Sequence, residues 1–212
     1  MTTPVNTRRY DASRRRAAAE DTRRAVLLAA RDLFAAQGYA ATSVAAIAAA
    51  AGVAVDTVYN SVGRKPQVLL AVHDLELGEG EAVPAEEREY VVAVRAAPTA
   101  RAKIATYAEA LGRLLPRTVP LADALRAAAA DDPECRRTWE ALNERRAANM
   151  LLFAADLRGT GELRDDLDDD EVARLVWSMN SAEYFTLVTS RGVDPQGYAD
   201  LVADVWTRTL LT

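Results

Sequence analysis

The segment from Thr22 to Val72 constrains the fold of this chain more than any other. It reads TRRAVLLAARDLFAAQGYAATSVAAIAAAAGVAVDTVYNSVGRKPQVLLAV, a helix followed by two short helices around a tight turn. This order is typical of a helix-turn-helix that reads DNA, whose second short helix enters the major groove. The segment ends within the first third or so of the chain, so we expect the remainder to have another task, such as sensing or dimerisation.

Apolar spacing predicts that the first helix of this segment covers residues 21–37. Four apolar residues recur at helical intervals and form one stripe: Val26, Ala30, Leu33 and Phe34. Gly38 follows, and glycine often closes a helix because it adopts the left-handed conformation without strain. We therefore expect one face of this helix to pack against the helices that follow.

The two short helices are predicted from their caps and from the turn between them. Either Thr42 or Ser43 caps the first of them. Its inward-facing residues are Val44, Ile47, Ala48 and Ala51. Gly52 permits a sharp turn, and the second short helix covers roughly residues 55–61.

Positive charge is concentrated at the N-terminus. Residues 1–66 hold ten Lys and Arg against five Asp and Glu, whereas residues 67–212 hold sixteen against twenty-six. The net charge of −5 therefore hides a basic module of the kind that binds nucleic acid. Residues 1–20 lack apolar periodicity but include Arg8, Arg9, Arg14, Arg15 and Arg16. We expect a mostly flexible arm there, either a solvated tail or one that touches phosphates or the minor groove.

The rest of the chain is predicted to be helical. Lys65-Pro66 opens a helix that runs toward residue 79, and residues 78–84 read as a connector. The next helix is predicted to start after Pro98 and to break at Pro116 and Pro120. Three more helices are predicted: one from Pro133 to about Arg158, one that ends at Ser190, and a last one that ends near Leu211. We predict an all-α fold of about nine helices. Its parts are a flexible basic arm at 1–20, a three-helix helix-turn-helix DNA-binding domain at 21–66, and a helical effector-binding and dimerisation domain at 67–212.

The sequence contains no sign of a membrane span, a bound metal or a cofactor. No uncharged run approaches the roughly 18–20 apolar residues of a span, and the start lacks a signal peptide's apolar core. Cys135, the single cysteine, fits a reducing cytosol, either as a passive thiol or as a redox sensor. The acidic run 168–171 is favoured as the start of a helix over a metal site. We expect a cytoplasmic protein with no cofactor.

The helix predicted to end at Ser190 is apolar around nearly its whole circumference. Its apolar residues are Val172, Leu175, Val176, Trp177, Met179, Ala182, Tyr184, Phe185, Leu187 and Val188. A helix of this kind is buried on all sides. The last helix adds Tyr198, Leu201, Val202, Val205, Trp206 and Leu210. We expect a homodimer through a four-helix bundle of these two helices from each chain, with packing inside one chain as the alternative.

The N-terminal residues resemble the TetR family of bacterial transcriptional regulators. The resemblance is carried by AARDLFAAQGY and ATSVAAIAAAAGVAVDTVYNSVGRK, and more loosely by ERRAANMLLFAADLRGTGELR and WSMNSAEYFTLVTSRGVDPQGYADLVADVW. It implies a dimeric repressor that reads an operator on double-stranded DNA. A small molecule bound in the C-terminal domain would then change the spacing of the two reading heads and release the DNA.

The resemblance also implies roles for single residues. Thr42 and Ser43 stand where family members touch phosphate, and Val55, Asp56 and Thr57 begin the recognition helix. Tyr59 matches a tyrosine that contacts phosphate and packs, and Lys65 matches the lysine that opens the next helix.

The chain departs from the family pattern at two places. Ala54 replaces the usual capping residue, and Ser61-Val62 replaces the usual His-Phe, which removes one phosphate donor or leaves a shorter hydroxyl. Asp56 either caps the recognition helix or accepts a hydrogen bond from a cytosine amino group.

Base reading is assigned to the exposed face of the recognition helix. Thr57, Asn60 and Val55 are the residues that we expect to reach base edges there. Asn is suited to pairing with adenine, whereas hydroxyls and lysines fix the register on phosphates. A plain polar surface role for Asn60 stays open.

The helix from Glu134 to Arg158 places a charge on an apolar stripe. Trp139, Leu142, Met150, Phe153 and Leu157 form the stripe, and Arg146 lies within it. A charge at such a position is costly unless it is paired. Arg146 therefore meets a carboxylate such as Glu183, or reaches solvent, or waits for an anionic or polar ligand.

A ligand cavity and plain core are both compatible with the neighbouring aromatic residues. The residues that we assign to an effector site are Tyr107, Trp139, Arg146, Asn149, Met150, Phe153 and Trp177. His73, the single histidine, lies near the join of the two domains and is either a pocket residue or simply packed.

Two other functions compete with a ligand-responsive repressor. One is a helical interaction or sensor protein that has lost specific DNA binding, which the departures at Ala54 and Ser61 allow. The other is an enzyme on a helical bundle, disfavoured because one His and one Cys assemble no catalytic set away from His73. We predict that the chain is not an enzyme.

Overall fold

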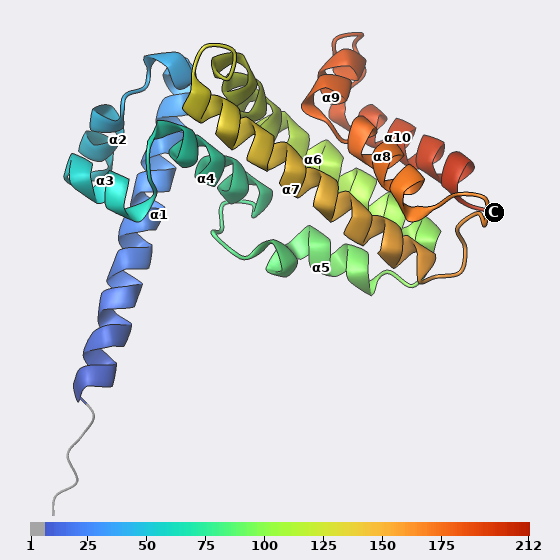
Figure 1. Ribbon diagram of the computed structural model, residues 1–212, viewed down its shortest axis with the longest axis horizontal. Coiled ribbons are helices and arrows are strands. Elements are labelled where there is room, and N and C mark those ends of the chain that lie inside the picture. Colours follow the sequence, from blue (N-terminus) through green and yellow to red (C-terminus); the bar gives the residue numbers. More distant parts are fainter. Residues whose placement is uncertain (1–6) are drawn as a thin grey trace, which may run out of the picture. The chain divides into compact units, whose positions relative to one another are not determined.

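The fold is described from a computed structural model, which gives the backbone of residues 7–212 and the side chains of residues 14–212. Within these residues the elements are α1 (Thr7–Ala41), α2 (Val44–Ala51), α3 (Val55–Ser61), α4 (Lys65–Leu77), the 3-10 helix η1 (Ala85–Glu87), α5 (Glu89–Ala96), α6 (Ala100–Ala128), α7 (Pro133–Arg158), α8 (Asp169–Met179), α9 (Ala182–Thr189) and α10 (Pro195–Leu210). The predicted all-α class is confirmed (Figure 1).

The chain divides into two compact units. The first ends at Val72, and the second runs from His73 to Thr212. The first unit thus extends beyond the domain limit expected at residue 66. The division falls within α4, so the backbone passes from one unit to the other as a continuous helix.

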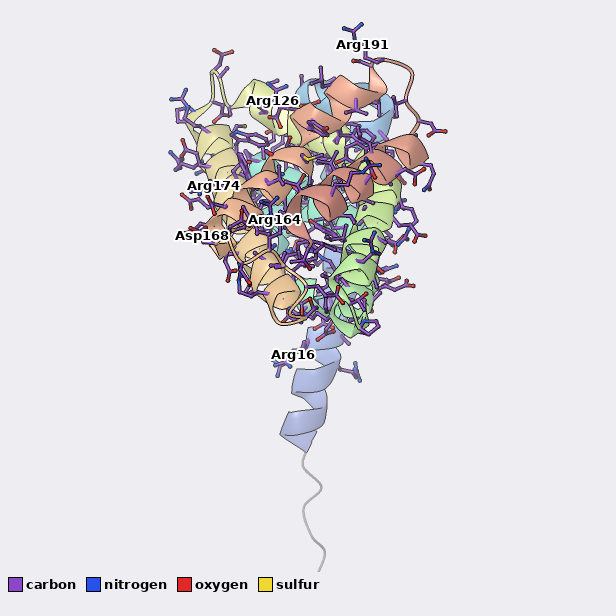
Figure 2. The ribbon with its side chains drawn as sticks, turned by 90° about the vertical axis from the view of Figure 1, so that its right-hand side faces the viewer. Arg16, Arg126, Arg164, Asp168, Arg174 and Arg191 are labelled. Carbon is purple, nitrogen blue, oxygen red and sulfur yellow. The ribbon has the colours of Figure 1, made fainter. Side chains whose placement is uncertain are left out.

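The start of α1 differs from the flexible arm expected at residues 1–20. Residues 7–20 are helical, and residues 1–6 lie outside the described part of the chain. The run RRRAAAE explains the helix, because arginine and alanine have high helix propensity. Arg16 projects from this part of α1 (Figure 2), where the side chains are exposed.

The first unit has a small core in which three helices meet. The helix α1 packs against α2 and α3, which also pack against each other. Val26, Ala30 and Phe34 of the predicted stripe are buried, whereas Leu33 is only partly buried. Gly38 has φ 77° and ψ 168°, so it interrupts the helical geometry as predicted before a last turn that ends at Ala41.

The second unit is organised around α6. This helix packs against α5, α7, α9 and α10, and α8 packs against α7 (Figure 1). Its core residues include Ile104, Tyr107 and Leu111 from α6, and Tyr198, Val202 and Trp206 from α10. Gly112 allows the close approach of α10, since a Cβ there would lie 2.8 Å from the carbonyl oxygen of Pro195.

The helix break predicted at Pro116 and Pro120 is wrong. Both prolines lie inside α6, which runs without interruption from Ala100 to Ala128. A proline inside a helix removes one backbone hydrogen bond and crowds the preceding turn. Both rings are exposed here, and the residues between and around them, such as Leu115 and Val119, are buried. Tertiary packing of the inner face therefore outweighs the local cost on the outer face.

The single helix predicted to end at Ser190 is instead two helices. The helix α8 ends at Met179 and α9 begins at Ala182. Ser181 caps α9 by accepting from the backbone N–H of Tyr184 at 3.1 Å, and Asn180 is buried between the two helices. Short polar side chains of this kind compete with the helical backbone for hydrogen bonds, which accounts for the break.

The acidic run 168–171 begins α8, as predicted. Asp168 accepts from the backbone N–H of Glu171 at 2.7 Å, and the Glu171 carboxylate accepts from the backbone N–H of Asp168 at 2.9 Å. These two bonds form a capping box, which satisfies donors that the helix start leaves free.

Two further sequence expectations can be compared with the described residues. Cys135 is buried in α7 and forms no disulfide. No single helix in residues 7–212 has the length and apolarity to cross a membrane, although α2 and α3, bent by 98°, meet those criteria as a pair.

Candidate functional site

The turn between α2 and α3 is built by local backbone chemistry. Ser43, one of the two residues proposed as caps, accepts from the backbone N–H of Ala46 at 3.1 Å. Gly52 closes α2 with φ 69°, in the left-handed region that favours glycine. Its backbone N–H reaches the carbonyl of Ala49 at 3.2 Å, and that of Val53 reaches Ala48 at 3.0 Å. The predicted helix-turn-helix is therefore confirmed.

The helix α3 presents a polar and aromatic outer face. Val58 is fully buried and anchors the helix, while Val55 is 38% exposed and Tyr59 is 46% exposed. Asn60 is exposed as well, and Thr57 is half-buried. Side chains that can reach a DNA groove thus stand on one short helix with a buried anchor.

The start of α3 has no side-chain cap. Ala54 occupies the cap position and makes no side-chain hydrogen bond there, so Asp56 does not replace the missing cap. Asp56 lies exposed in the first turn, where its charge complements the helix dipole. At the other end of α3, the guanidinium of Arg23 donates to the carbonyl of Ser61, which ties this end to α1.

Two of the predicted DNA-contacting residues hold the corner between α1 and α2. Thr42 is 1% exposed, and its hydroxyl donates to the carbonyl of Gly38 at 2.8 Å. Lys65 lies over the ring of Tyr39, with Nζ 4.1 Å from the centroid, and donates to the carbonyl of Ala40 at 3.4 Å. Burial makes Thr42 a poor phosphate contact, whereas Ser43 and Lys65 keep accessible atoms.

The second unit contains a cavity of about 590 Å³ that is partly open to solvent. Ligand sites for small molecules fall in the range of roughly 300–1,000 Å³. The end of α4, α5, α6 and α7 supply most of the lining. Much of it is apolar, including Leu77, Tyr90, Val94, Tyr107, Leu111 and Phe153. The size and lining suit one organic molecule with a substantial apolar part.

Five of the seven residues proposed for an effector site line this cavity. They are Tyr107, Arg146, Asn149, Met150 and Phe153. Trp139 instead lines an adjoining cavity of about 30 Å³. Trp177 lines neither of the two and is 37% exposed, and its ring centroid lies 5.5 Å from Cζ of Arg146.

Arg146 does not form an ion pair with Glu183, so this one of the alternatives raised for Arg146 is wrong. Glu183 lies on the exposed side of α9, and its carboxylate is 3.6 Å from Nε of Arg126 (Arg126 is labelled in Figure 2). Arg146 instead donates to neutral oxygens, Oδ1 of Asn180 at 2.6 Å and Oδ1 of Asn143 at 3.2 Å. Burial lowers the pKa of the Arg146 guanidinium. No carboxylate within the described residues forms an ion pair with it.

Asn180 joins the break between α8 and α9 to the cavity wall. Its amide donates to the hydroxyl of Tyr107 at 2.9 Å and lies 3.0 Å from the sulfur of Met150. Burial raises the pKa of the Tyr107 phenol, so this hydroxyl stays protonated. The sequence offered one signal for this residue, a polar side chain in the middle of an apolar stretch.

Asp74, near the end of α4, forms ion pairs with two arginines. Arg145 donates to both of its carboxylate oxygens, at 2.7 and 2.9 Å, and the buried Arg88 lies 3.5 Å away. Burial would raise the pKa of Asp74, but the neighbouring His73 and Arg145 outweigh it and lower the pKa to about 2. The long N–O distance of 3.8 Å from His73 makes Arg145 the stronger partner.

A second ion pair joins Asp156, which lines the cavity, to Lys103, which does not. Lys103 is 4% exposed, and its Nζ lies 2.9 Å from the carboxylate of Asp156. The same ammonium donates to the carbonyls of Val94 and Arg95, at 3.1 and 2.9 Å. Sequence patterns did not reveal Lys103, Arg88 or Asp74, because each partner is distant in the sequence.

Comparison with known proteins gives one family match, which lies within the first unit. Residues 26–72 match the model of the family described as bacterial regulatory proteins, tetR family. No curated protein matches the chain.

Solved structures match over most of the chain. A candidate transcriptional regulator from Saccharomonospora viridis, solved in complex with choline, is 18% identical, with 91% of this chain and 99% of that chain covered and a TM-score of 0.67. SmeT, solved with triclosan, is 18% identical with 91% and 92% covered and a TM-score of 0.64. NalD from Pseudomonas aeruginosa, the secondary repressor of a multidrug efflux pump, is 22% identical with 91% and 98% covered and a TM-score of 0.63.

The first unit thus contains a helix-turn-helix with an exposed face on α3, and the chain has the fold of solved transcriptional regulators. More narrowly, residues 26–72 match the tetR family of bacterial regulatory proteins, and the chain as a whole has the fold of solved proteins described as TetR-family regulators. The resemblance read from the sequence is thereby confirmed.

Proposed function

We propose that this protein is a repressor that binds an operator on double-stranded DNA through α2 and α3 and is released when a small molecule fills the cavity of the second unit. One observation carries the proposal. The chain joins a helix-turn-helix with an exposed face on α3 to a unit that contains a cavity of about 590 Å³, and the single helix α4 is continuous between them.

The DNA contacts that we propose divide into two kinds. Asn60, Thr57 and Val55 read base edges, because they stand on the outer face or side of α3. Ser43, Tyr59 and Lys65 fix the register on phosphates. The family pattern places Thr42 among them, but its burial favours a structural role at the α1–α2 corner.

A small-molecule effector is supported by the cavity and by related structures. Two proteins of this fold were solved with bound small molecules, choline and triclosan. In this chain Tyr107, Arg146, Asn149, Met150 and Phe153 are the proposed contacts. Trp139 and Trp177 support the wall from outside, as neither lines the main cavity.

TetR regulators act as dimers, and we propose that this chain dimerises through α8, α9 and α10. Leu187 is 62% exposed, and Leu201 and Trp177 are 38% and 37% exposed. Val188, Tyr184 and Val205 are only half-buried on the same helices. A second copy would cover this apolar surface, and sedimentation of the purified protein measures the mass.

The alternatives have weaker support. A protein that had lost DNA binding would have no use for the exposed aromatic and amide side chains of α3. A catalytic role lacks a candidate set, because His73 is the single histidine, and Cys135 is buried and does not line the cavity that His73 lines. We therefore propose a regulator without catalytic activity, located in the cytoplasm.

A DNA selection followed by a reporter assay tests the function. Random double-stranded DNA is selected on the purified chain, and the enriched site is cloned upstream of a reporter gene. A two-fold symmetric site and reduced reporter output on expression of the chain are expected for a dimeric repressor. Increased reporter output would show that the protein is an activator and not a repressor. The absence of any enriched site would refute operator binding.

A further inference from the structure

We propose that the effector is an amphipathic organic anion, whose carboxylate binds the guanidinium of Arg146 while its apolar body lies along the wall formed by Tyr107, Leu111 and Phe153. This inference rests on the proposed function, since it takes the cavity to be the effector site. It adds the chemical class of the molecule and the residue that recognises its charge.

The charges around the cavity do not cancel. Lys103 and Asp156 neutralise each other across 2.9 Å, and Glu86 and Arg95, which also line the cavity, contribute one charge of each sign. Arg88 and Arg145 share one carboxylate, that of Asp74, which leaves an excess of one positive charge there. Arg146 adds a second, because none of the described carboxylates forms an ion pair with it.

This positive cavity lies in an acidic part of the chain. Residues 67–212 contain sixteen Lys and Arg against twenty-six Asp and Glu. The local excess is therefore opposite in sign to that of the unit as a whole. Arg146 is half-buried and its hydrogen-bond acceptors are neutral oxygens, so an anionic ligand would supply the counter-charge that the described residues do not provide.

The hydrogen bonds of Arg146 leave donors for a ligand. Its Nη2 lies near the carbonyl of Asn180 and that residue's Oδ1, at 3.2 and 2.6 Å, and its Nη1 donates to Asn143. A guanidinium has five N–H groups, and its Nε–H donates to none of the described residues. The neutral acceptors orient the guanidinium but do not neutralise it. A carboxylate can take the remaining donors in a charge-assisted bond.

His73 marks the same end of the cavity. His73 and Arg146 line both the main cavity and the adjoining space of about 30 Å³, so the two side chains lie close together. The imidazole is 8% exposed, and its Nδ1, 3.8 Å from the Asp74 carboxylate, makes no hydrogen bond to any described residue. Nδ1 of His73 can therefore form a hydrogen bond with a head group bound at this end of the cavity.

The remainder of the wall specifies the apolar body. Tyr107, Phe153 and Trp206 form a cluster of rings, with the Tyr107 and Phe153 centroids 5.0 Å apart, and Tyr90 stacks on Tyr107 at 6.2 Å. Leu111 and Leu115 add aliphatic surface. The guanidinium of Arg146 and this apolar wall match a molecule with a single charged head, such as an aliphatic or aromatic monocarboxylic acid.

Matched probes that differ only in the head group test the inference. Decanoate, 1-decanol and decyltrimethylammonium are titrated into the full-length protein by calorimetry, below the concentrations at which they aggregate. Naphthalene-2-carboxylate and naphthalene-2-methanol form an aromatic pair. We expect at least one carboxylate to bind about 10–100-fold more tightly than its neutral partner and more tightly than the cation, as expected for a charged hydrogen bond.

Variants of α7 assign the effect to Arg146. Arg146→Gln keeps an N–H donor for Asn180 but removes the charge, so carboxylate affinity should fall about 10–100-fold while alcohol affinity stays the same. Arg146→Lys keeps the charge and should lose less. Arg137→Gln is the matched control, because Arg137 is exposed on the same helix and does not line the cavity.

Each outcome decides the inference. It is overturned if no carboxylate binds, if the alcohol or the cation binds as tightly as the carboxylate, or if Arg146→Gln binds carboxylates like wild type. If Arg146→Gln does not fold, the head-group comparison on the wild-type protein decides alone. Repeating the titration on the operator-bound protein separates the two claims. Carboxylate binding that leaves the DNA complex intact supports this inference and refutes release by the effector, whereas release by a neutral molecule alone does the reverse.

Discussion

The two units of the chain place their polar side chains in opposite environments. In the unit that ends at Val72, Tyr59 and Asn60 stand on the outside of α3, where only Val58 is anchored in the core. In the unit that begins at His73, Lys103 and Arg88 are buried around a cavity and engaged with carboxylates.

In the first unit, DNA binding and folding stability therefore depend on different residues. In the second unit, the residues around the ligand cavity also contribute to folding stability. An exposed side chain that contacts DNA can be removed with little effect on folding, since water replaces it in the free protein. A buried charge around the cavity is part of an ion pair, and its removal leaves the partner as an uncompensated charge inside the protein. We therefore expect substitutions in the second unit to change folding stability more than those on α3.

The largest effect is expected at Lys103. Lys103→Met leaves Asp156 without its partner and removes the donor to the carbonyls of Val94 and Arg95. We expect a loss of about 3 kcal/mol in the free energy of unfolding, the low end for a broken buried pair, because the Asp156 side chain is 34% exposed. Urea unfolding measures it. Arg101→Met, exposed on the same helix, should change stability by less than about 0.5 kcal/mol, and equal losses would contradict the contrast.

The next effect concerns Asp74 and depends on pH. Its pKa is lowered from 3.8 to about 2 in the folded protein, so its stabilisation is present above about pH 4 and is lost as the pH falls toward 2. The shift corresponds to about 2 kcal/mol. The stability difference between wild type and Asp74→Asn should therefore shrink by about this amount between pH 5 and pH 2. A difference that does not change over this range would show that the ion pairs of Asp74 contribute nothing.

Gly52 tests whether the first unit depends on its turn. The residue has φ 69°, and no atom lies within 4 Å of a Cβ placed there, so Gly52→Ala introduces backbone strain without a clash. We expect a loss of about 1 kcal/mol, and a smaller loss for Gly52→Asn, because asparagine tolerates the left-handed conformation. Thermal unfolding followed by circular dichroism measures both. Equal losses for alanine and asparagine would argue against backbone strain as the cause.

The smallest effect on stability is expected on α3. Asn60→Ala should weaken binding to the selected operator about tenfold and leave the unfolding free energy unchanged within about 0.5 kcal/mol. Tyr59→Phe should weaken binding to all DNA sequences to a similar degree, as expected for a phosphate contact. Fluorescence anisotropy on operator and random duplexes distinguishes the two. A uniform loss for Asn60→Ala would remove it from base reading.

The first unit could be predicted from the sequence because its signals are local. The interruption of α1 at Gly38, the turn at Gly52 and α3 over residues 55–61 follow from caps, glycine and apolar spacing, and the structure has them, although α1 continues to Ala41 instead of ending at Gln37. The helical start of α1 is the exception, because the helix propensity of RRRAAAE outweighs its lack of apolar spacing.

The second unit was predicted less well because its determinants are long-range. Pro116 and Pro120 read as a break, yet the packing of the inner face of α6 keeps the helix continuous. Arg146 was recognised as a charge on an apolar stripe, but Asn180 lies thirty-four positions away and could not be assigned as its partner. The ion pairs of Asp74 with Arg145 and of Lys103 with Asp156 also join residues far apart in the sequence, and no spacing pattern indicates that they would meet.

Sequence-specific DNA binding is the claim on which the rest depends. The direct measurement is a gel shift of the full-length protein on DNA from around its own gene, at two salt concentrations and with excess random competitor. We predict a complex that resists competitor and weakens steeply with salt, since phosphate contacts release counterions. A complex that random competitor removes at both salt concentrations would contradict operator binding near its own gene, and failure of the random-sequence selection as well would contradict the account.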